Sequence, residues 1–295
     1  MRWLLPLALL AACLVIAAAW LGASGPGARH DPEPAATAER PLGLFTSLPI
    51  LWRETGDIAD LLRGDAAPHP ALGVLSRHGR PVALDTLADA SGALPLPPEG
   101  LLVMAQPRPL SPQENVALDS WVRGGGRVLL FADPLLTAHS AFAVGDRRRP
   151  QDVVLLSPIL TRWGLALQFD ETQPADERMA ALPGEGGAQG VVIPVNLPGS
   201  FAVVAGEGAC TLVAGGLLAR CRIGAGRVLA LADAAVLEDN GAALEARDRA
   251  LSWLLSEAIR PPHGKSGNGS PQRGNSFHNS GIKHRILRTF GENPR

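Results

Sequence analysis

The sequence predicts an α/β domain behind an N-terminal transmembrane helix: a mostly parallel sheet with flanking helices plus a small antiparallel β insertion or edge. Three observations lead to this prediction. Between Pro41 and Arg260, short apolar runs alternate with helical patterns, which is typical of parallel strands connected by helices. Residues 188–233 instead hold several short strands with glycine turns, which indicates antiparallel pairing. Residues 3–23 carry no charged side chain and are long enough to cross a bilayer as a helix.

The N-terminal apolar segment is longer than the about 7–15 residues usual in a secretory signal peptide, which favours a membrane anchor. Arg2 precedes it, so the positive-inside rule keeps Arg2 in the cytoplasm and the rest of the chain outside. The small residues at Leu21–Gly25 also permit cleavage, and both outcomes stay open. We therefore expect residues 1–23 to be a membrane anchor or uncleaved signal in the inner (cytoplasmic) membrane, with an extracytoplasmic soluble domain.

The rest of the chain divides by composition. Residues 24–40 are rich in Pro, Ala and Gly and are interpreted as a linker, residues 41–260 as the α/β domain, and residues 261–295 as a polar, disordered tail. Of 295 residues, 46% are apolar but only 4% are aromatic, so the core must be built mainly from Leu, Val and Ala. A formal net charge of −1 gives no electrostatic case for a nucleic-acid partner. We expect no metal site and no cofactor.

Inside the α/β domain, each apolar run bounded by turn residues predicts a strand. These runs are residues 42–48, 71–75, 100–106 and 127–134. Residues 76–81, which contain an Arg-His-Gly sequence, are interpreted as a solvated turn between strands. Helices are predicted at residues 57–63, from Ser157-Pro158 to Gly164, and at about 246–259.

The helix with the clearest boundaries begins after residue 111. Ser111 is its N-cap, Pro112 takes the first helical position, and Glu114 completes a capping box. Gly124 is expected to end the helix as a C′ residue. The helix therefore leads directly into the strand that starts at Arg127, as in a parallel α/β unit.

Two similar strings lie one hundred residues apart: GGGRVLLFADP at residues 124–134 and GAGRVLALADA at residues 224–234. A capped helix precedes the first, whereas a hairpin with residues 224–226 as its turn precedes the second. We therefore interpret them as one structural device used twice, a glycine turn followed by a buried strand, and not as a duplicated domain. Each strand ends in an aspartate, and parallel strands bring Asp133 and Asp233 to the carboxyl edge of the sheet, where α/β proteins bind ligands.

These two aspartates, with Glu238 and Asn240 of the sequence EDN, form a candidate rim for a ligand or a partner. An aspartate at a strand end also caps turns and helices, and that structural role is the alternative. No residue is assigned a catalytic role.

Cys210 and Cys221 flank two short apolar arms around Gly215-Gly216, a two-residue hairpin turn signal. With that turn, paired residue numbers sum to 431, so the two cysteines lie directly opposite on one face. An oxidising compartment permits a disulfide between them. Two free, buried thiols in a strand pair are the alternative.

The strings PRPLSPQENVALDSWVRGGGRVLLFADP and GAGRVLALADAAVLEDN, followed by RDRALSWLL, resemble the auxiliary components of ABC transporters first associated with gliding motility. The resemblance covers roughly residues 42–255. It implies a soluble domain similar to class I glutamine-amidotransferase-like or intraflagellar-transport-like α/β domains. It also implies partners, an ABC permease and its ATPase, and no enzymatic activity.

The function expected from these observations is a membrane-anchored, non-enzymatic accessory domain of an envelope ABC transport system. No nucleophile elbow of the G-x-S-x-G type is present in the sequence, which agrees with a binding role. An extracytoplasmic hydrolase or a ligand sensor that acts at the carboxyl edge of the sheet is the alternative.

Overall fold

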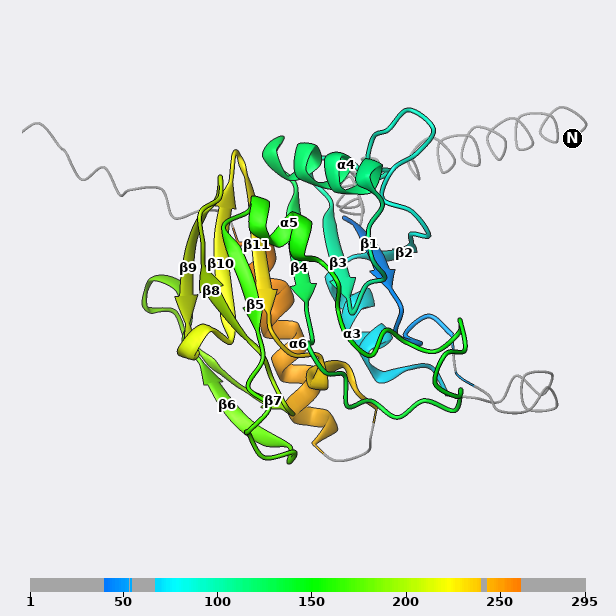
Figure 1. The fold of residues 1–295 in the computed structure, drawn as a ribbon, viewed down its shortest axis with the longest axis vertical. Coiled ribbons are helices and arrows are strands. Elements are labelled where there is room, and N and C mark those ends of the chain that lie inside the picture. Colours follow the sequence, from blue (N-terminus) through cyan, green and yellow to red (C-terminus); the bar gives the residue numbers. More distant parts are fainter. Residues whose placement is uncertain (1–39, 53, 55–66, 240–242, 261–295) are drawn as a thin grey trace, which may run out of the picture. The chain divides into compact units, whose positions relative to one another are not determined.

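The computed structural model describes residues 40–52, 54, 67–239 and 243–260 (Figure 1). The expected anchor at residues 1–23, most of the linker, the helix at 57–63, Asn240 and the tail at 261–295 lie outside these ranges. Within them, no helix combines the length and the apolarity that crossing a bilayer requires.

The centre of the domain is a seven-stranded sheet in the order β2-β1-β3-β4-β11-β10-β9. The five strands from β2 to β11 run parallel, and β10 and β9 continue the sheet as antiparallel strands. Their bounds are β1 Pro41–Thr46, β2 Arg80–Ala83, β3 Leu101–Ala105, β4 Arg127–Phe131, β9 Ala209–Val213, β10 Leu218–Ile223 and β11 Gly226–Leu231. The predicted α/β class, with a mostly parallel sheet and an antiparallel edge, is confirmed.

Two further antiparallel pairs lie outside the central sheet, β5 with β8 and β6 with β7. Their bounds are β5 Leu165–Gln168, β6 Arg178–Leu182, β7 Val191–Val195 and β8 Ser200–Val203. The helices are α3 Pro70–His78, α4 Pro112–Arg123, α5 Ser157–Arg162 and α6 Leu244–Ile259, with short 3₁₀ turns η1 Glu185–Gly187, η2 Ala214–Gly216 and η3 Ala235–Leu237.

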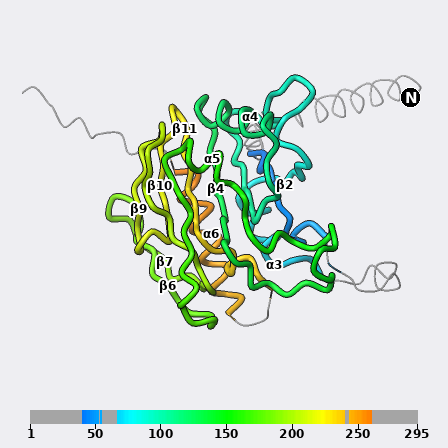
Figure 2. The backbone as a smooth tube through the Cα atoms, viewed as in Figure 1, coloured from blue at the N-terminus to red at the C-terminus, as the bar shows by residue number. Residues whose placement is uncertain are grey.

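Helices cover both faces of the central sheet. Side chains of α3 and α6 pack against one face, and side chains of α4 and α5 pack against the other. Alternate residues of β3 therefore enter different cores: Leu101 and Val103 enter the first, Leu102 and Met104 the second. A strand covered on both faces has no polar side, which explains the unbroken apolar runs of the sequence. Figure 2 shows β9, β10 and β11 at the opposite end of the sheet from β2.

The two similar strings of the sequence lie side by side. β4 and β11 are parallel neighbours, and their register pairs Arg127 with Arg227. A Cβ atom on Gly126 would lie 2.3 Å from the Trp121 ring, and one on Gly226 would lie 1.9 Å from the Val122 carbonyl oxygen. Both glycines are therefore required because the last turn of α4 packs directly on the two strand starts.

The strand predicted at residues 71–75 is wrong, because this segment belongs to α3. Nδ1 of His69 accepts a hydrogen bond from the Ala71 N–H over 3.2 Å and caps the helix, and Pro70 takes the first helical position. The buried residues Ala71, Val74 and Leu75 follow helical spacing. The expected turn at residues 76–81 is likewise replaced by the end of α3, Gly79 and the start of β2.

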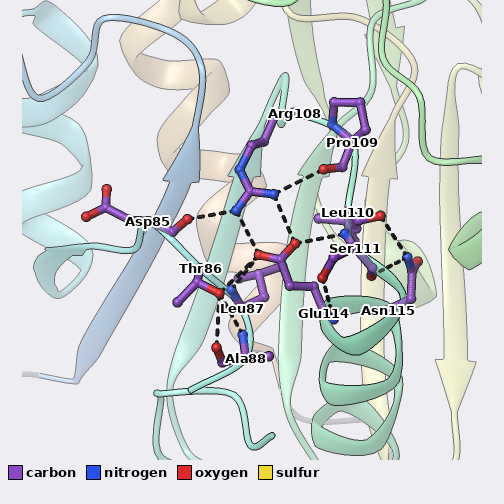
Figure 3. Close-up of polar contacts among 10 residues, drawn as sticks. All are labelled: Asp85, Thr86, Leu87, Ala88, Arg108, Pro109, Leu110, Ser111, Glu114 and Asn115. Carbon is purple, nitrogen blue, oxygen red and sulfur yellow. Dashed lines mark hydrogen bonds and ion pairs between the residues drawn. The ribbon is translucent and has the colours of Figure 1, made fainter. Parts of the chain in front are cut away.

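The capping box of α4 is confirmed, and the structure extends it. Glu114 is buried, and it accepts hydrogen bonds from the N–H groups of Ser111 and Leu87 (Figure 3). Arg108 donates to both of its carboxylate oxygens over 2.8 and 2.9 Å. These Arg108 hydrogen bonds lower the Glu114 pKa to about 2. Gly124 was expected to be the C′ residue that ends the helix, but its backbone is still helical, with φ −74°. The positive φ that follows the helix belongs to Gly125, at 118°.

In the structure, Cys210 of β9 lies opposite Cys221 of β10, and the two sulfur atoms form a disulfide. The connection between the strands is the four-residue segment 214–217, not a two-residue turn. Ala214, Gly215 and Gly216 all have positive φ angles in it. The register is unchanged, because a longer connection centred on the same point keeps the same residue pairs.

Candidate functional site

The parallel strands β1, β3, β4 and β11 end at one edge of the central sheet, which we call the carboxyl edge. Gln106 follows β3, Asp133 lies two residues beyond β4, and Asp233 lies two residues beyond β11. All three side chains are fully buried, with no exposed surface. In open α/β sheets this edge is the usual place for a ligand.

No local pattern marks Gln106 as a site residue. Its backbone has φ 44°, an uncommon conformation for a residue other than glycine. Its side-chain nitrogen donates to the carbonyl oxygens of Asp133 and Gln151 over 3.1 and 2.8 Å, and its side-chain oxygen accepts from the Asp133 N–H over 3.0 Å. Gln106 therefore joins the ends of β3 and β4 and has its amide group turned to the protein interior.

Asp133 and Asp233 have structural contacts on every carboxyl oxygen. The two oxygens of Asp133 accept from the N–H groups of Leu135 and Ala234 over 2.8 and 3.1 Å. Those of Asp233 accept from the N–H groups of Ala235 and Asn196 over 2.7 and 2.9 Å. Together these bonds connect three chain segments at the carboxyl edge. Sequence analysis predicted both aspartates at this edge, and both lie there. Their side chains are buried and cap turns instead of lying on the surface.

Burial dominates the protonation of these two carboxyls. Removal from water penalises the charged form and raises the pKa of Asp133 to about 7. Burial also raises the pKa of Asp233 well above its usual value, and the negative charge of Asp133 raises it further. The pair therefore retains part of a proton near neutral pH.

Glu238 lies next to this pair and is half-buried. Thr137 Oγ1 donates to its Oε1 over 2.7 Å. Burial raises the pKa of Glu238, while the Thr137 hydrogen bond and the positive charge of Arg247 oppose that rise. In turn, the charge of Glu238 raises the pKa of both Asp133 and Asp233. The three carboxyl groups therefore form one electrostatically coupled cluster.

A cavity of about 260 Å³ opens beside this cluster at the carboxyl edge. Its lining residues come from loops that follow β1, β4 and β11 and from the start of α3. They are Leu48, Pro49, His69, Leu136, Thr137, Ala138, His139, Pro150, Ala234, Leu237, Glu238 and Asp239. Of the predicted rim residues, Glu238 alone lines this cavity among those that the structure describes. The described residues hold no group of three or more His, Cys, Asp or Glu side chains arranged for a metal ion.

Comparison with protein families gives one match, the domain of unknown function DUF4350, over residues 69–255. This match covers more than half of the chain. The chain belongs to the DUF4350 family. The matched region of this DUF4350 chain runs from the N-cap of α3 into α6, and it includes Gln106 and all three carboxyl groups of the cluster. No protein of curated function matches the sequence.

Solved structures show only distant likeness to this DUF4350 chain. An exo-β-1,4-mannosidase from Opitutaceae bacterium strain TAV5 is 15% identical with a TM-score of 0.41, over 75% of this chain and 36% of that one. The mmIFT52 N-terminal domain is 12% identical with a TM-score of 0.43, over 75% of this chain and 98% of that domain. A ThuA-like protein from Parabacteroides merdae ATCC 43184 is 11% identical with a TM-score of 0.37, over 77% of this chain and 93% of that protein. The chain thus spans about a third of the mannosidase.

Proposed function

We propose that this DUF4350 chain is a non-enzymatic binding domain, held at the inner membrane by residues 3–23, that serves as an accessory of an envelope ABC transporter. In this proposal the domain is extracytoplasmic, and the carboxyl edge is its binding surface. The ABC partners, a permease and its ATPase, come from the resemblance described in the sequence.

The main support for a domain without enzymatic activity is the conformation of Gln106. A strained turn directly after a central strand is where α/β hydrolases present a nucleophile. Here that position holds an amide with no nucleophilic atom, and the amide is fully buried and bonded to the backbone. The neighbouring Asp133 and Asp233 are also buried turn caps. Binding at this edge therefore has more support than the alternative of a hydrolase acting through the two aspartates.

The position of the chain ends in the fold supports a tethered binding domain. The Arg40 carbonyl oxygen accepts from the Arg80 N–H over 3.0 Å, at the start of β2. The Arg260 carbonyl oxygen accepts from Arg227 over 2.9 Å, at the start of β11. Both ends of the domain therefore leave it at the amino-terminal edge of the sheet. A tether at residue 40 leaves the carboxyl edge accessible to a partner.

Exposed apolar side chains near the cavity also support a partner surface. Leu51 and Trp52 follow β1, and Val144 follows β4. The Trp52 and Phe142 rings lie 6.4 Å apart, so the two loops meet. Exposed apolar groups that gather in one region are typical of interaction sites.

Capture of the full chain from native membranes tests the proposal. The tagged chain is extracted in mild detergent and its partners are identified by mass spectrometry. The matched control keeps residues 1–40 and carries an unrelated soluble domain in place of residues 41–260. We expect an ABC permease and ATPase with the full chain and not with the control. If both proteins are absent while the bait is intact, or if the control captures them equally, the proposal is wrong.

A further inference from the structure

The central sheet ends in two edge strands, and the first of them, β2, is protected against pairing with another chain. It begins with Arg80 and Pro81. The N–H groups of Arg80 and Leu84 donate to carbonyl oxygens on the β1 side. Because backbone groups alternate in direction along a strand, the nitrogen of Pro81 points outward, where it offers no N–H. A charged residue and an outward proline are usual devices that keep an edge strand from pairing with another chain.

The strand at the other end of the sheet, β9, has neither device. Its sequence, Ala-Cys-Thr-Leu-Val, contains no charged residue and no proline. Among the strands that the structure describes, β10 is its only neighbour in the sheet (Figure 1). The Cys210–Cys221 disulfide holds β9 to β10, so the edge is already ordered without a partner. An ordered, uncharged edge strand is a template for pairing with another strand.

The register with β10 shows which backbone groups of β9 point outward. Cys210 and Cys221 are directly paired, and their Cα atoms lie 4.0 Å apart. Antiparallel pairs alternate between hydrogen-bonded ones, with Cα atoms about 5.5 Å apart, and non-hydrogen-bonded ones, about 4.5 Å apart. The N–H and C=O of Cys210 therefore point away from β10, and those of Leu212, two residues later, do the same. Outside the sheet ladder, no backbone hydrogen bond among the described residues involves either of them.

These outward groups are complementary to those of a second copy of β9. In an antiparallel pair centred on Thr211, Cys210 lies opposite the partner's Leu212, and the two residues exchange both of their hydrogen bonds. Thr211 lies opposite the partner's Thr211, and threonine pairs are favourable cross-strand neighbours. Ala209 and Val213 form the outer pairs, so no charge meets a like charge. A two-fold axis beside Thr211 generates this arrangement, and two-fold symmetry is the commonest in homo-oligomers.

Apolar side chains in the segment before β9 add to this surface. Val203 ends β8 and is 59% exposed, and Val204 after it is 36% exposed. The Val204 N–H donates to the Gly164 carbonyl oxygen over 3.0 Å, which fixes the segment beside the end of α5. Exposed apolar groups next to an open strand edge are typical of an interaction site.

We propose that two copies of this chain associate through β9, in an antiparallel pair that joins their seven-stranded sheets into one. The inference goes beyond the proposed function, because it uses neither the carboxyl edge nor the ABC partners. The open edge and its match to its own copy carry it. A strand from residues 261–295 of the same chain, or one from another protein, is the alternative occupant.

Sedimentation equilibrium of the full chain in density-matched mild detergent tests the proposal. We expect a monomer–dimer equilibrium with a dissociation constant in the micromolar range, as suits a small interface. A monomer at every concentration in that range would overturn the proposal, and it is the result expected if either alternative strand occupies β9.

Charges introduced at the two-fold axis locate the interface. Thr211→Lys places like charges opposite each other and should weaken the association at least about tenfold. Thr211→Glu should have the same effect alone, and it keeps a favourable cross-strand neighbour within the chain, because Arg220 of β10 pairs with this position. An equimolar mixture of the two variants should associate about as tightly as the wild type, because opposite charges then meet.

Met179→Lys is the matched control, since Met179 is an exposed residue of β6, and it should leave the association unchanged. Urea unfolding followed by Trp163 fluorescence verifies that each variant folds. Should Thr211→Lys not fold, Thr211→Glu alone retains the test. Association that is unchanged in a folded Thr211 variant, or lost equally in the control, would contradict an interface at β9. A mixture that does not recover would contradict the two-fold pairing at Thr211.

Discussion

Replacement of Asp133 with Asn should remove much of the pH dependence of stability between about pH 5 and about pH 8. Burial raises the Asp133 pKa from 3.8 to about 7 in the folded chain. The folded state therefore binds this proton more tightly than the unfolded state. The resulting stabilisation is fully present below the unfolded pKa and is lost as the pH rises through the folded value.

The size of the effect follows from the shift. A rise from 3.8 to about 7 corresponds to about 4 kcal/mol, of which about 3 kcal/mol falls between about pH 5 and about pH 8. An amide does not titrate, so the variant lacks this slope. Asp233 also loses a like-charged neighbour, which reduces the slope further. At about pH 5 the variant should be less stable than the wild type by about 1–3 kcal/mol, because an amide NH₂ replaces one acceptor.

Urea unfolding of the full chain in mild detergent, followed by tryptophan fluorescence, measures this difference. Trp163 is fully buried and reports the loss of the core. The control, Asp170→Asn, removes an exposed carboxyl whose pKa is lowered by its Thr172 hydrogen bonds, and its stability should follow the wild-type curve in this pH range. Parallel pH curves for the wild type and the Asp133→Asn variant would refute the reasoning.

Three further predictions concern the fold. Glu114→Gln should lower the free energy of unfolding by about 3 kcal/mol near neutral pH, because the variant loses a buried carboxylate that accepts from Arg108 and from backbone N–H groups. The urea midpoint measures this loss, and a change below about 0.5 kcal/mol would contradict the prediction. Reduction of the Cys210–Cys221 disulfide should lower the free energy of unfolding by about 3 kcal/mol, because the bond restricts the loop that it closes in the unfolded chain. A urea midpoint that dithiothreitol does not change would contradict this prediction. Gly226→Ala should cost more than about 3 kcal/mol, whereas Gly73→Ala, with space around it on α3, should be neutral or stabilising by up to about 1 kcal/mol. Equal thermal midpoints for these two variants would contradict the close packing of α4.

Local signals in the sequence were sufficient for much of the fold. The capping residues Ser111 and Glu114 identified α4, and the apolar runs identified β1, β3 and β4. The strand prediction for segment 71–75 is wrong because five apolar or small residues in a row fit a buried strand as well as a helix. The His69 cap that decides for the helix is an uncommon one, since Ser, Thr, Asp and Asn are the preferred N-caps.

The candidate site was less predictable than the fold. The positions of Asp133 and Asp233 follow from parallel strands, but their burial depends on distant segments. Val154 donates to the Asp133 carbonyl oxygen, and Asn196 donates to the Asp233 carboxylate. No local pattern reports such contacts. The cavity likewise joins residues near positions 48, 69, 137 and 238, which only the tertiary fold brings together. One sequence signal for the cavity is the order of the elements, because the loops that follow parallel strands line the binding edge.

Hydrogen–deuterium exchange tests the central claim most directly, namely that the carboxyl edge is a binding surface. Exchange is compared between the full chain alone and the same chain in the complex captured from native membranes. The account predicts slower exchange in residues 134–156 and 234–239 at the carboxyl edge, with little change in the turns at residues 124–126 and 224–226 at the opposite edge. Protection confined to the opposite edge, or the same exchange in both states, would contradict it.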